Sequence, residues 1–178
     1  MPTYVSLLRA VNLAGKNKVP MAELRPLFGT LGHTDVRTYI QSGNVVSQHD
    51  EPDPRVLERD AAAAIEQRFG FPVPVIVRTP DQLREALDHD PYVEVADHKR
   101  VAYVFLSAAP EPAKLGSIDP DGYAPDVFTV RGREVYVHYP DGVHRSKLTH
   151  ALFERRFGVY ATARNRRTVE QLLKLSQG

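Results

Sequence analysis

The sequence predicts an α+β protein made of two tandem ferredoxin-like subdomains, each with the order β-α-β-β-α-β plus a trailing helix. Two observations lead to this fold class. Short motifs recur in the two halves of the chain, and the strands and helices expected around those motifs follow the same order in both halves. An internal duplication accounts for both observations.

The recurring motifs are a tripeptide and a helix-start signal. Arg-Phe-Gly occurs at residues 68–70 and again at 156–158, each time at the end of a helical pattern. A Thr-x-x-Gln pattern begins at Thr79 and again at Thr168. Such a pattern predicts a capping box, in which the Thr hydroxyl and the Gln amide satisfy free backbone donors at a helix start.

The elements of the first half follow from hydrophobic periodicity and turn residues. In chain order they are a strand at 4–9, a helix at 21–31, a hairpin of strands at 36–41 and 45–48, a helix at 54–69, a strand at 73–77 and a helix at 82–87. Asp53 and Pro54 give the second helix a typical start. Pro26 lies inside the first helix, where it removes one hydrogen bond and is expected to kink it.

The second half repeats this order with a shorter first helix. Its expected elements are a strand at 101–106, a helix at 112–116, a hairpin of strands at 127–130 and 134–139, a helix around 148–157, a strand at 159–163 and a helix at 169–175. The acidic segment 88–99 is the expected junction. We therefore expect the first ferredoxin-like half at residues 1–97 and the second at 98–178.

The composition is ordinary for a globular protein. The 178 residues carry a formal charge of +1, which gives no overall electrostatic footprint for nucleic acid. The chain has no cysteine, which excludes disulfides, thiolate catalysis and cysteine-based metal sites. Without an apolar run of membrane-spanning length or a signal pattern, the expected location is cytoplasmic, away from membranes.

The best candidate site joins the loop after the first strand with the turn of the first hairpin. In a ferredoxin-like sheet the third strand lies between the first two, so both connections emerge at one edge. The candidate ligand-binding residues are Arg9, Asn12, Lys16, Asn17, Lys18, Gln41, Ser42 and Asn44. Cations, amides and the backbone of a glycine-containing loop suit an anionic ligand such as a phosphate or a carboxylate.

A purely structural role is the alternative for these residues. Asn and Gln side chains commonly cap neighbouring backbone groups, and Lys16 and Lys18 taken singly are typical solvated cations. The corresponding connection in the second half, residues 107–112, is short and lacks a cation. The long polar loop of the first half is therefore an addition that the scaffold does not require.

A secondary basic cluster lies in the second half, at Arg145, Lys147, Arg164, Asn165 and Arg167. The segment 161–164 aligns with the aliphatic segment 74–77 of the first half, so Thr162 and Arg164 replace apolar residues. This replacement indicates either a ligand or partner contact, or a solvated edge strand whose charges discourage aggregation.

Other common chemistries receive little support. His138, His144 and His150 do not have the spacing of metal ligands, and Ser42 is outside a Gly-x-Ser-x-Gly elbow. The sequence thus indicates no cofactor and no metal. Four aromatics of the second half resemble the base-stacking residues of RNA-binding sheets, but packing is the favoured role for Tyr103, Phe105, Tyr136 and Tyr139.

The segments 7–21 and 38–46 closely resemble the bacterial domain-of-unknown-function family 1697 (DUF1697), and the tail 147–169 is similar to that family's C-terminal motif. The resemblance implies a duplicated ferredoxin-like architecture and no established activity, cofactor or catalytic residue. The chain departs from the family pattern at four positions. The family usually has Gly at Ala10 and Ala14, Asn at His150 and Trp at Arg166.

The function expected from the sequence is that of an uncharacterised protein that binds an anionic small molecule, or a nucleic-acid phosphate with weaker support, at residues 9–18 and 41–44. One alternative is an enzyme in which Arg9 or Lys18 stabilises charge in a transition state. Another is a protein–protein interaction module that pairs through a sheet edge. The sequence leaves open which class applies, and it leaves the oligomeric state open.

Overall fold

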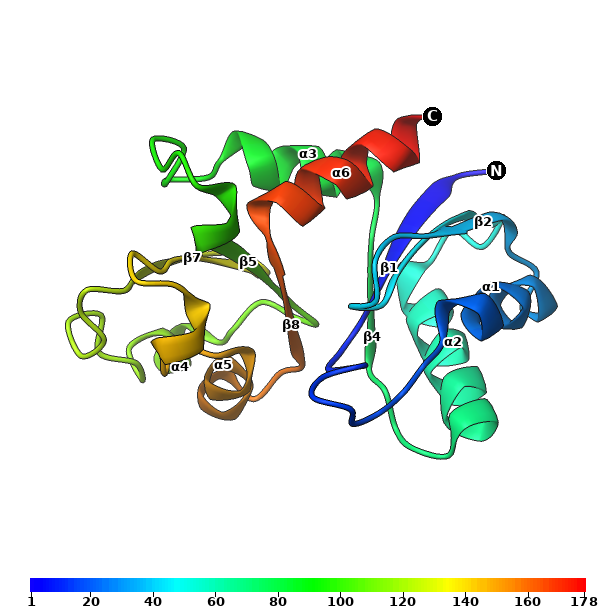
Figure 1. Ribbon diagram of the computed structural model, residues 1–178, viewed down its shortest axis with the longest axis horizontal. Coiled ribbons are helices and arrows are strands. Elements are labelled where there is room, and N and C mark those ends of the chain that lie inside the picture. The colour runs from blue at the N-terminus through cyan, green and yellow to red at the C-terminus, as the bar shows by residue number, and fades with distance from the viewer. The chain divides into compact units, whose positions relative to one another are not determined.

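The computed structural model describes residues 1–178, and the order β-α-β-β-α-β-α occurs twice along the chain (Figure 1). The first set is β1 (Thr3–Leu8), α1 (Met21–Thr30), β2 (Thr34–Thr38), β3 (Asn44–Gln48), α2 (Pro54–Phe69), β4 (Val75–Arg78) and α3 (Pro80–Asp88). The second set is β5 (Val101–Leu106), α4 (Pro112–Leu115), β6 (Val127–Arg131), β7 (Glu134–His138), α5 (His150–Phe157), β8 (Ala161–Asn165) and α6 (Arg166–Gln177). The predicted order of elements is confirmed.

The chain divides into two compact units. The first unit comprises Met1–Arg84 together with Gln171–Gly178, and the second comprises Glu85–Glu170. Helices α3 and α6 therefore each run across a boundary between units. The compact units differ in this respect from a simple division into 1–97 and 98–178, which follows the repeat of the sequence.

Each unit contains one four-stranded antiparallel sheet. The strand order is β2-β3-β1-β4 in the first unit and β6-β7-β5-β8 in the second. Strand β3 lies between β1 and β2 and is antiparallel to both, as expected. This arrangement brings the loop after β1 and the connection between β2 and β3 to the same edge of the sheet.

Helices α1 and α2 cover one face of the first sheet (Figure 1). Tyr4, Leu8, Val45 and other strand residues pack with the apolar sides of these helices in one buried cluster. In the second unit, Val104, Val135 and their neighbours form an equivalent core with α5. The apolar periodicity of the sequence therefore specified which helix faces are buried.

Side chains cap the starts of several helices, and one of the predicted caps is wrong. The Asp53 carboxylate accepts a hydrogen bond from the Arg55 N–H at 3.0 Å and caps α2. Thr79 and Gln82 form the predicted capping box, at 3.2 Å and 2.9 Å. The second predicted box is wrong, because α6 begins at Arg166, ahead of Thr168. Asn165 Oδ1 accepts from the Thr168 N–H at 2.9 Å and caps the helix instead.

The strand boundaries also correct the alignment of the two halves. Strand β8 begins at Ala161, two residues later than expected. Leu8 pairs with Val75 and Leu106 pairs with Ala161, and three residues further along β4 and β8 stand Arg78 and Arg164. Arg164 therefore corresponds to Arg78 rather than to the aliphatic Val77. Both halves place an arginine here, and both arginines are buried.

Candidate functional site

The two candidate loops of the first unit lie in direct contact. We call residues 9–18 and 39–44 together the loop pair. Asn12 Nδ2 donates to the carbonyl of Gln41 at 2.7 Å and to that of Val19 at 3.0 Å, while its Oδ1 accepts from the Val19 N–H at 2.8 Å. One side chain thus closes its own loop and holds it against the hairpin connection.

The backbone of the loop pair is unusual. Six non-glycine residues of the chain have positive φ, and five of them lie here: Ala10, Asn12, Ala14, Asn17 and Ile40, with φ between 50° and 56°. This conformation is uncommon outside glycine and is an outlier for a β-branched residue such as Ile40. Positions 10 and 14, where the resemblance implies Gly, are two of the five. Ala therefore occupies the left-handed region at both positions.

Gly43 is required by the contact between the two loops. It has φ +88°, and a Cβ at this position would lie 2.7 Å from Leu8 Cβ and 2.7 Å from Val11 Cγ2. Its carbonyl accepts from the Leu8 N–H at 2.9 Å. A side chain larger than hydrogen would push β1 and the hairpin connection apart.

Several predicted site residues have structural roles. Asn17 Nδ2 donates to the Ala10 carbonyl at 3.3 Å. Asn44 is fully buried, and its Nδ2 donates to the Tyr39 carbonyl at 2.8 Å and to Ser42 Oγ at 2.9 Å. These amides satisfy local backbone and hydroxyl groups, which is the alternative that the sequence had left open.

The groups that face solvent at the loop pair are cationic, amide and apolar. Lys16, Lys18 and Gln41 are exposed, whereas Arg9 is half-buried. Two large apolar side chains are exposed beside them, Leu13 at 52% and Ile40 at 49%. The N–H groups of Ala14, Gly15 and Asn17 have no partner within the protein. The loop pair thus offers positive charge and free backbone donors next to apolar surface.

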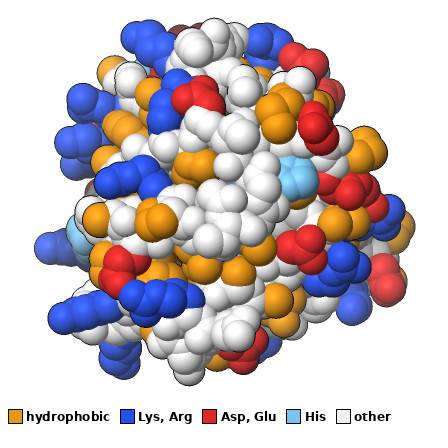
Figure 2. All heavy atoms as spheres, turned by 90° about the vertical axis from the view of Figure 1, so that its right-hand side faces the viewer, with side chains coloured by type: hydrophobic (Ala, Val, Ile, Leu, Met, Phe, Trp, Pro, Cys, Tyr) orange, Lys and Arg blue, Asp and Glu red, His pale blue; other side chains and the backbone are white.

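The surface of the protein as a whole is not strongly positive. Figure 2 shows charges of both signs interspersed over the face drawn, with cations more frequent on its left side. This agrees with the formal charge of +1 for the whole chain. The positive charge at the loop pair therefore comes from particular residues and not from the net field of the molecule.

The secondary basic cluster is divided among different environments. Arg164 and Asn165 belong to β8, where Arg164 is buried and donates to Thr162 Oγ1 at 2.6 Å and to the Ala163 carbonyl at 2.9 Å. Burial lowers the pKa of Arg164 to about 10, so it stays charged at neutral pH. Thr162 and Arg164 do not form a solvated edge. Arg167 is exposed on α6, and Arg145 and Lys147 line a pocket of the second unit.

A buried polar network in the second unit was not found from the sequence. Asp90 Oδ2 accepts from Arg166 Nε at 2.7 Å, from Arg166 Nη2 at 2.6 Å and from Tyr103 Oη at 2.5 Å. Asp90 Oδ1 accepts from the Tyr92 N–H at 2.7 Å. Burial, reinforced by Asp90, raises the pKa of the Tyr103 hydroxyl, so this tyrosine stays protonated. Arg166 also donates to the carbonyls of Tyr92 and Val95, which ties the segment after α3 to the start of α6.

A cavity of about 270 Å³ adjoins this network. Its lining includes His98 and Glu170, whose side chains are 2.6 Å apart. All members of the network are satisfied within the protein, so it is best explained as a structural tie. Nowhere in the chain do three or more His, Asp or Glu side chains gather in a way that could hold a metal ion.

The aromatic residues of the second sheet do not present a base-stacking surface. Tyr103, Phe105, Tyr136 and Tyr139 are each at most 3% exposed. The Tyr136 hydroxyl donates to the Ala86 carbonyl at 2.7 Å, and the Tyr139 hydroxyl donates to the Leu148 carbonyl at 2.6 Å. Packing, the favoured role, accounts for all four side chains.

The architecture defines a class of α+β proteins with two similar halves, each built on a four-stranded antiparallel sheet. The chain belongs to the family described as "Protein of unknown function (DUF1697)", whose sequence profile matches residues 1–136. This range contains the whole loop pair, whereas the C-terminal segment 147–169 lies beyond it. Membership assigns no activity.

One solved structure with the same fold is described as "conserved bacterial protein SP0830 from Streptococcus pneumoniae". It is 20% identical to this chain, with a TM-score of 0.71, and the similarity covers 100% of this chain and 99% of that one. No curated protein matches the sequence. No helix has the length and apolar character needed to cross a membrane.

Proposed function

We propose that residues 1–97 and 98–178 are duplicated ferredoxin-like halves and that the loop pair of the first half binds an anionic small molecule. The order β-α-β-β-α-β and the strand order β4-β1-β3-β2 support the ferredoxin-like assignment. In this proposal the second half has the ferredoxin-like fold without the long loop, and the first half has the same fold with the loop added after β1.

The observation that carries the proposal is the concentration of left-handed backbone in the loop pair. Each non-glycine residue in a sparsely populated region costs on the order of 1–3 kcal/mol and persists only where the surroundings enforce it. Five of the six such residues in this chain lie in these two segments. Strained residues of this kind cluster at ligand sites, and the hydrogen bonds of Asn12 provide the enforcement here.

The available groups indicate the chemical class of the ligand. Successive N–H groups in a turn that alternates between right- and left-handed conformations form concave sites for anions. The free N–H groups of residues 14, 15 and 17 and the ammonium groups of Lys16 and Lys18 suit a phosphate or a carboxylate. The exposed Leu13 and Ile40 would contact an apolar or aromatic part of the same molecule. A nucleotide or a similar organic anion has both parts.

One observation favours a second candidate. Leu13 and Ile40 are large apolar side chains on loops, and such residues also serve as anchors in protein–protein contacts. An enzyme that uses Arg9 or Lys18 to stabilise developing charge is compatible with the same surface.

The proposal is tested by thermal shift with inorganic phosphate, acetate and AMP. The wild-type chain is compared with Lys16→Gln/Lys18→Gln and with Lys99→Gln/Lys174→Gln, whose lysines are exposed elsewhere. Both double variants lose two positive charges, so general electrostatics affect them equally. We expect at least one anion to raise the melting temperature of the wild type and of the control, with most of the shift lost in Lys16→Gln/Lys18→Gln.

Equal responses of the three proteins would place the anion elsewhere and contradict the proposal, as would the absence of a response to all three probes. The double variant Leu13→Ser/Ile40→Ser distinguishes anion binding from a protein–protein contact at the loop pair. If this variant retains phosphate binding but loses self-association or partner capture, the apolar residues serve a protein contact.

A further inference from the structure

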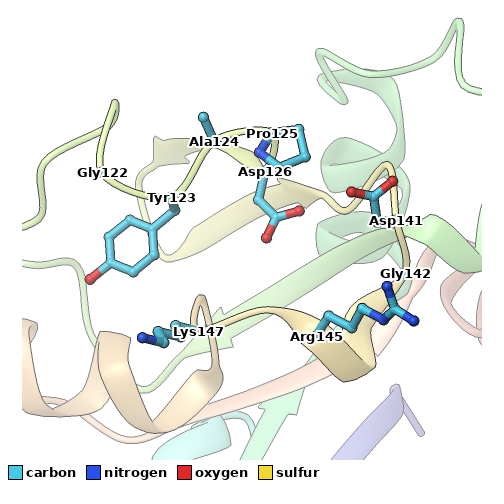
Figure 3. Close-up of a pocket in the computed structure, with 9 residues that line it drawn as sticks. All are labelled: Gly122, Tyr123, Ala124, Pro125, Asp126, Asp141, Gly142, Arg145 and Lys147. Atoms are coloured by element: carbon cyan, nitrogen blue, oxygen red, sulfur yellow. The ribbon is translucent and has the colours of Figure 1, made fainter.

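A pocket in the second unit is lined by Asp126, a largely buried residue whose carboxylate faces the pocket without a protein partner. The pocket has a volume of about 290 Å³. It is lined by the segment 122–126 and by Asp141, Gly142, Arg145 and Lys147. In Figure 3 the Asp126 carboxylate points from one wall toward the space in front of Arg145 and Lys147 on the opposite wall. The pocket shares no residue with the loop pair.

Asp126 is only 8% exposed, yet its side chain makes no hydrogen bond or ion pair within the protein. The buried Tyr139 hydroxyl does not supply one. Tyr139 donates its proton to the Leu148 carbonyl at 2.6 Å, and the field of Asp126 reaches it only as a contribution, after burial, to its raised pKa. The carboxylate oxygens are open to the pocket and its water, so a bound ammonium group would exchange this hydration for an ion pair.

The opposite wall carries two cations that are also unpaired. Arg145 lies in a single turn, Val143–Arg145, that follows β7, and Lys147 lies just before α5. Neither side chain makes an ion pair with Asp126, with the rim residue Asp141 or with any other acid. The pocket therefore has a negative wall and a positive wall, separated by enough space for a small molecule.

We propose that this pocket binds a small zwitterion whose ammonium group pairs with Asp126 and whose carboxylate or phosphate pairs with Arg145 and Lys147. The volume corresponds to roughly ten water molecules. This is near the lower end of ligand pockets and suits a molecule of amino-acid size. A simple anion would leave Asp126 unpaired, and a simple cation would leave both basic residues unpaired.

The test is an NMR titration of the full chain with phosphoethanolamine, β-alanine and γ-aminobutyrate, which differ in their anionic group and in the separation of charges. Ethanolamine and inorganic phosphate serve as probes with one charged end. Binding is followed at the amides of Gly122 and Gly142, which belong to the pocket. We expect at least one zwitterion to bind at least tenfold more tightly than either single-charge probe.

Two variants test which residues bind the ammonium group and the anionic group of the zwitterion. Asp126→Asn keeps the shape of the side chain, and Arg145→Gln/Lys147→Gln removes the positive wall. Each is expected to weaken zwitterion binding at least tenfold. Glu94→Gln, at an exposed acid outside the pocket, is expected to leave it unchanged. The proposal fails if no zwitterion shifts the Gly122 and Gly142 amides, if phosphate alone binds as tightly, or if Asp126→Asn binds like the wild type.

The stability of the ligand-free protein gives an independent readout. Because the Asp126 carboxylate is open to the pocket and unpaired in the ligand-free protein, Asp126→Asn is expected to change the melting temperature little without ligand. A carboxylate that pairs with Arg145 or Lys147 in solution would make the same variant less stable. Equal losses of stability in Asp126→Asn and in the single variants Arg145→Gln or Lys147→Gln would identify an internal ion pair and overturn the proposal.

Discussion

The Asn12 side chain donates to the main-chain carbonyl of Gln41 at 2.7 Å, across 29 positions of sequence. This bond joins the loop after β1 to the connection between β2 and β3. The same amide closes its own loop through both polar atoms of Val19, at 3.0 Å and 2.8 Å. Three hydrogen bonds from one residue thus hold the loop pair in shape.

Asn12→Asp is expected to destabilise the first unit by about 1–3 kcal/mol, because it removes the two donors and places a carboxylate against two carbonyl oxygens. Aspartate retains an oxygen that accepts from the Val19 N–H, and it also tolerates positive φ. The loss of stability therefore measures the contribution of the two Asn12 N–H donors. Urea unfolding measures the change. A difference below about 0.5 kcal/mol would show that Asn12 does not tie the loops.

Gly43→Ala is expected to cost at least about 2 kcal/mol, since the new methyl group would overlap Leu8 and Val11 at a position with φ +88°. Gly15→Ala is the matched control. It also has positive φ, +77°, but no atom lies within 4 Å of its added Cβ. Only the backbone cost of about 1–2 kcal/mol remains there. Equal losses in the two variants would contradict the close approach at Gly43.

Ala10→Gly and Ala14→Gly are each expected to stabilise the protein by up to about 1 kcal/mol. The left-handed conformation costs alanine about 1–2 kcal/mol, and the greater freedom of unfolded glycine offsets about 0.5–1 kcal/mol. Ala63→Gly, at an exposed position inside α2, is expected to lose about 1 kcal/mol. If all three variants lose stability to the same extent, the loop alanines do not have positive φ in solution.

Asp90→Asn is expected to destabilise the protein by about 3–5 kcal/mol, because it leaves the buried Arg166 guanidinium without its counter-ion. Replacing both members, as in Asp90→Leu/Arg166→Met, is expected to cost less than the sum of the single changes. Arg84→Gln breaks the exposed pair with Asp81 and is expected to cost less than about 0.5 kcal/mol. A double-mutant cycle with additive losses would contradict a coupled buried pair.

His33 is expected to make stability fall as the pH is lowered from about 6.5 to about 4. Burial, with a smaller contribution from His49, lowers the pKa of His33 to about 4 in the folded protein, against about 6.5 when unfolded. Between these values the unfolded chain binds the proton and the folded chain does not, so stability is present above pH 6.5 and is lost below it. The loss reaches at most about 3 kcal/mol and levels off below pH 4.

The measurement is the free energy of unfolding at pH 7 and at pH 4.5 for the wild type, His33→Gln and the exposed control His144→Gln. Carboxylates contribute to the pH dependence of all three proteins, so the difference between them isolates His33. The decrease in the free energy of unfolding between pH 7 and pH 4.5 is expected to be smaller in His33→Gln than in the wild type and in His144→Gln. Identical slopes in all three would show that His33 titrates normally.

Local signals allowed much of the fold to be predicted. Asp53 and Pro54 marked the start of α2, and Gly70 marked its end, because a cap depends on residues within one turn. The start of α6 was misplaced because Asn165 and Thr168 are both good capping residues, and β8 runs directly into the helix. Sequence spacing alone did not show which of the two the backbone would use.

The candidate site was only partly accessible from the sequence. Topology was enough to bring residues 9–18 beside residues 41–44, but it did not show that Asn17 and Asn44 are used by neighbouring backbone groups. The pairing of Asp90 with Arg166 joins residues 76 positions apart, beyond any local pattern. Asp126 had no motif around it, and only its burial beside a pocket singles it out.

The most direct test of anion binding at the loop pair is an amide NMR titration of the wild-type chain with AMP and inorganic phosphate. The proposed site predicts saturable shifts at the N–H groups of Ala14, Gly15 and Asn17, with smaller shifts around Gln41 and unchanged resonances at the equivalent connection, residues 107–112. Shifts that spare residues 9–18, or that appear equally at residues 107–112, would contradict the claim that the added loop is a binding site.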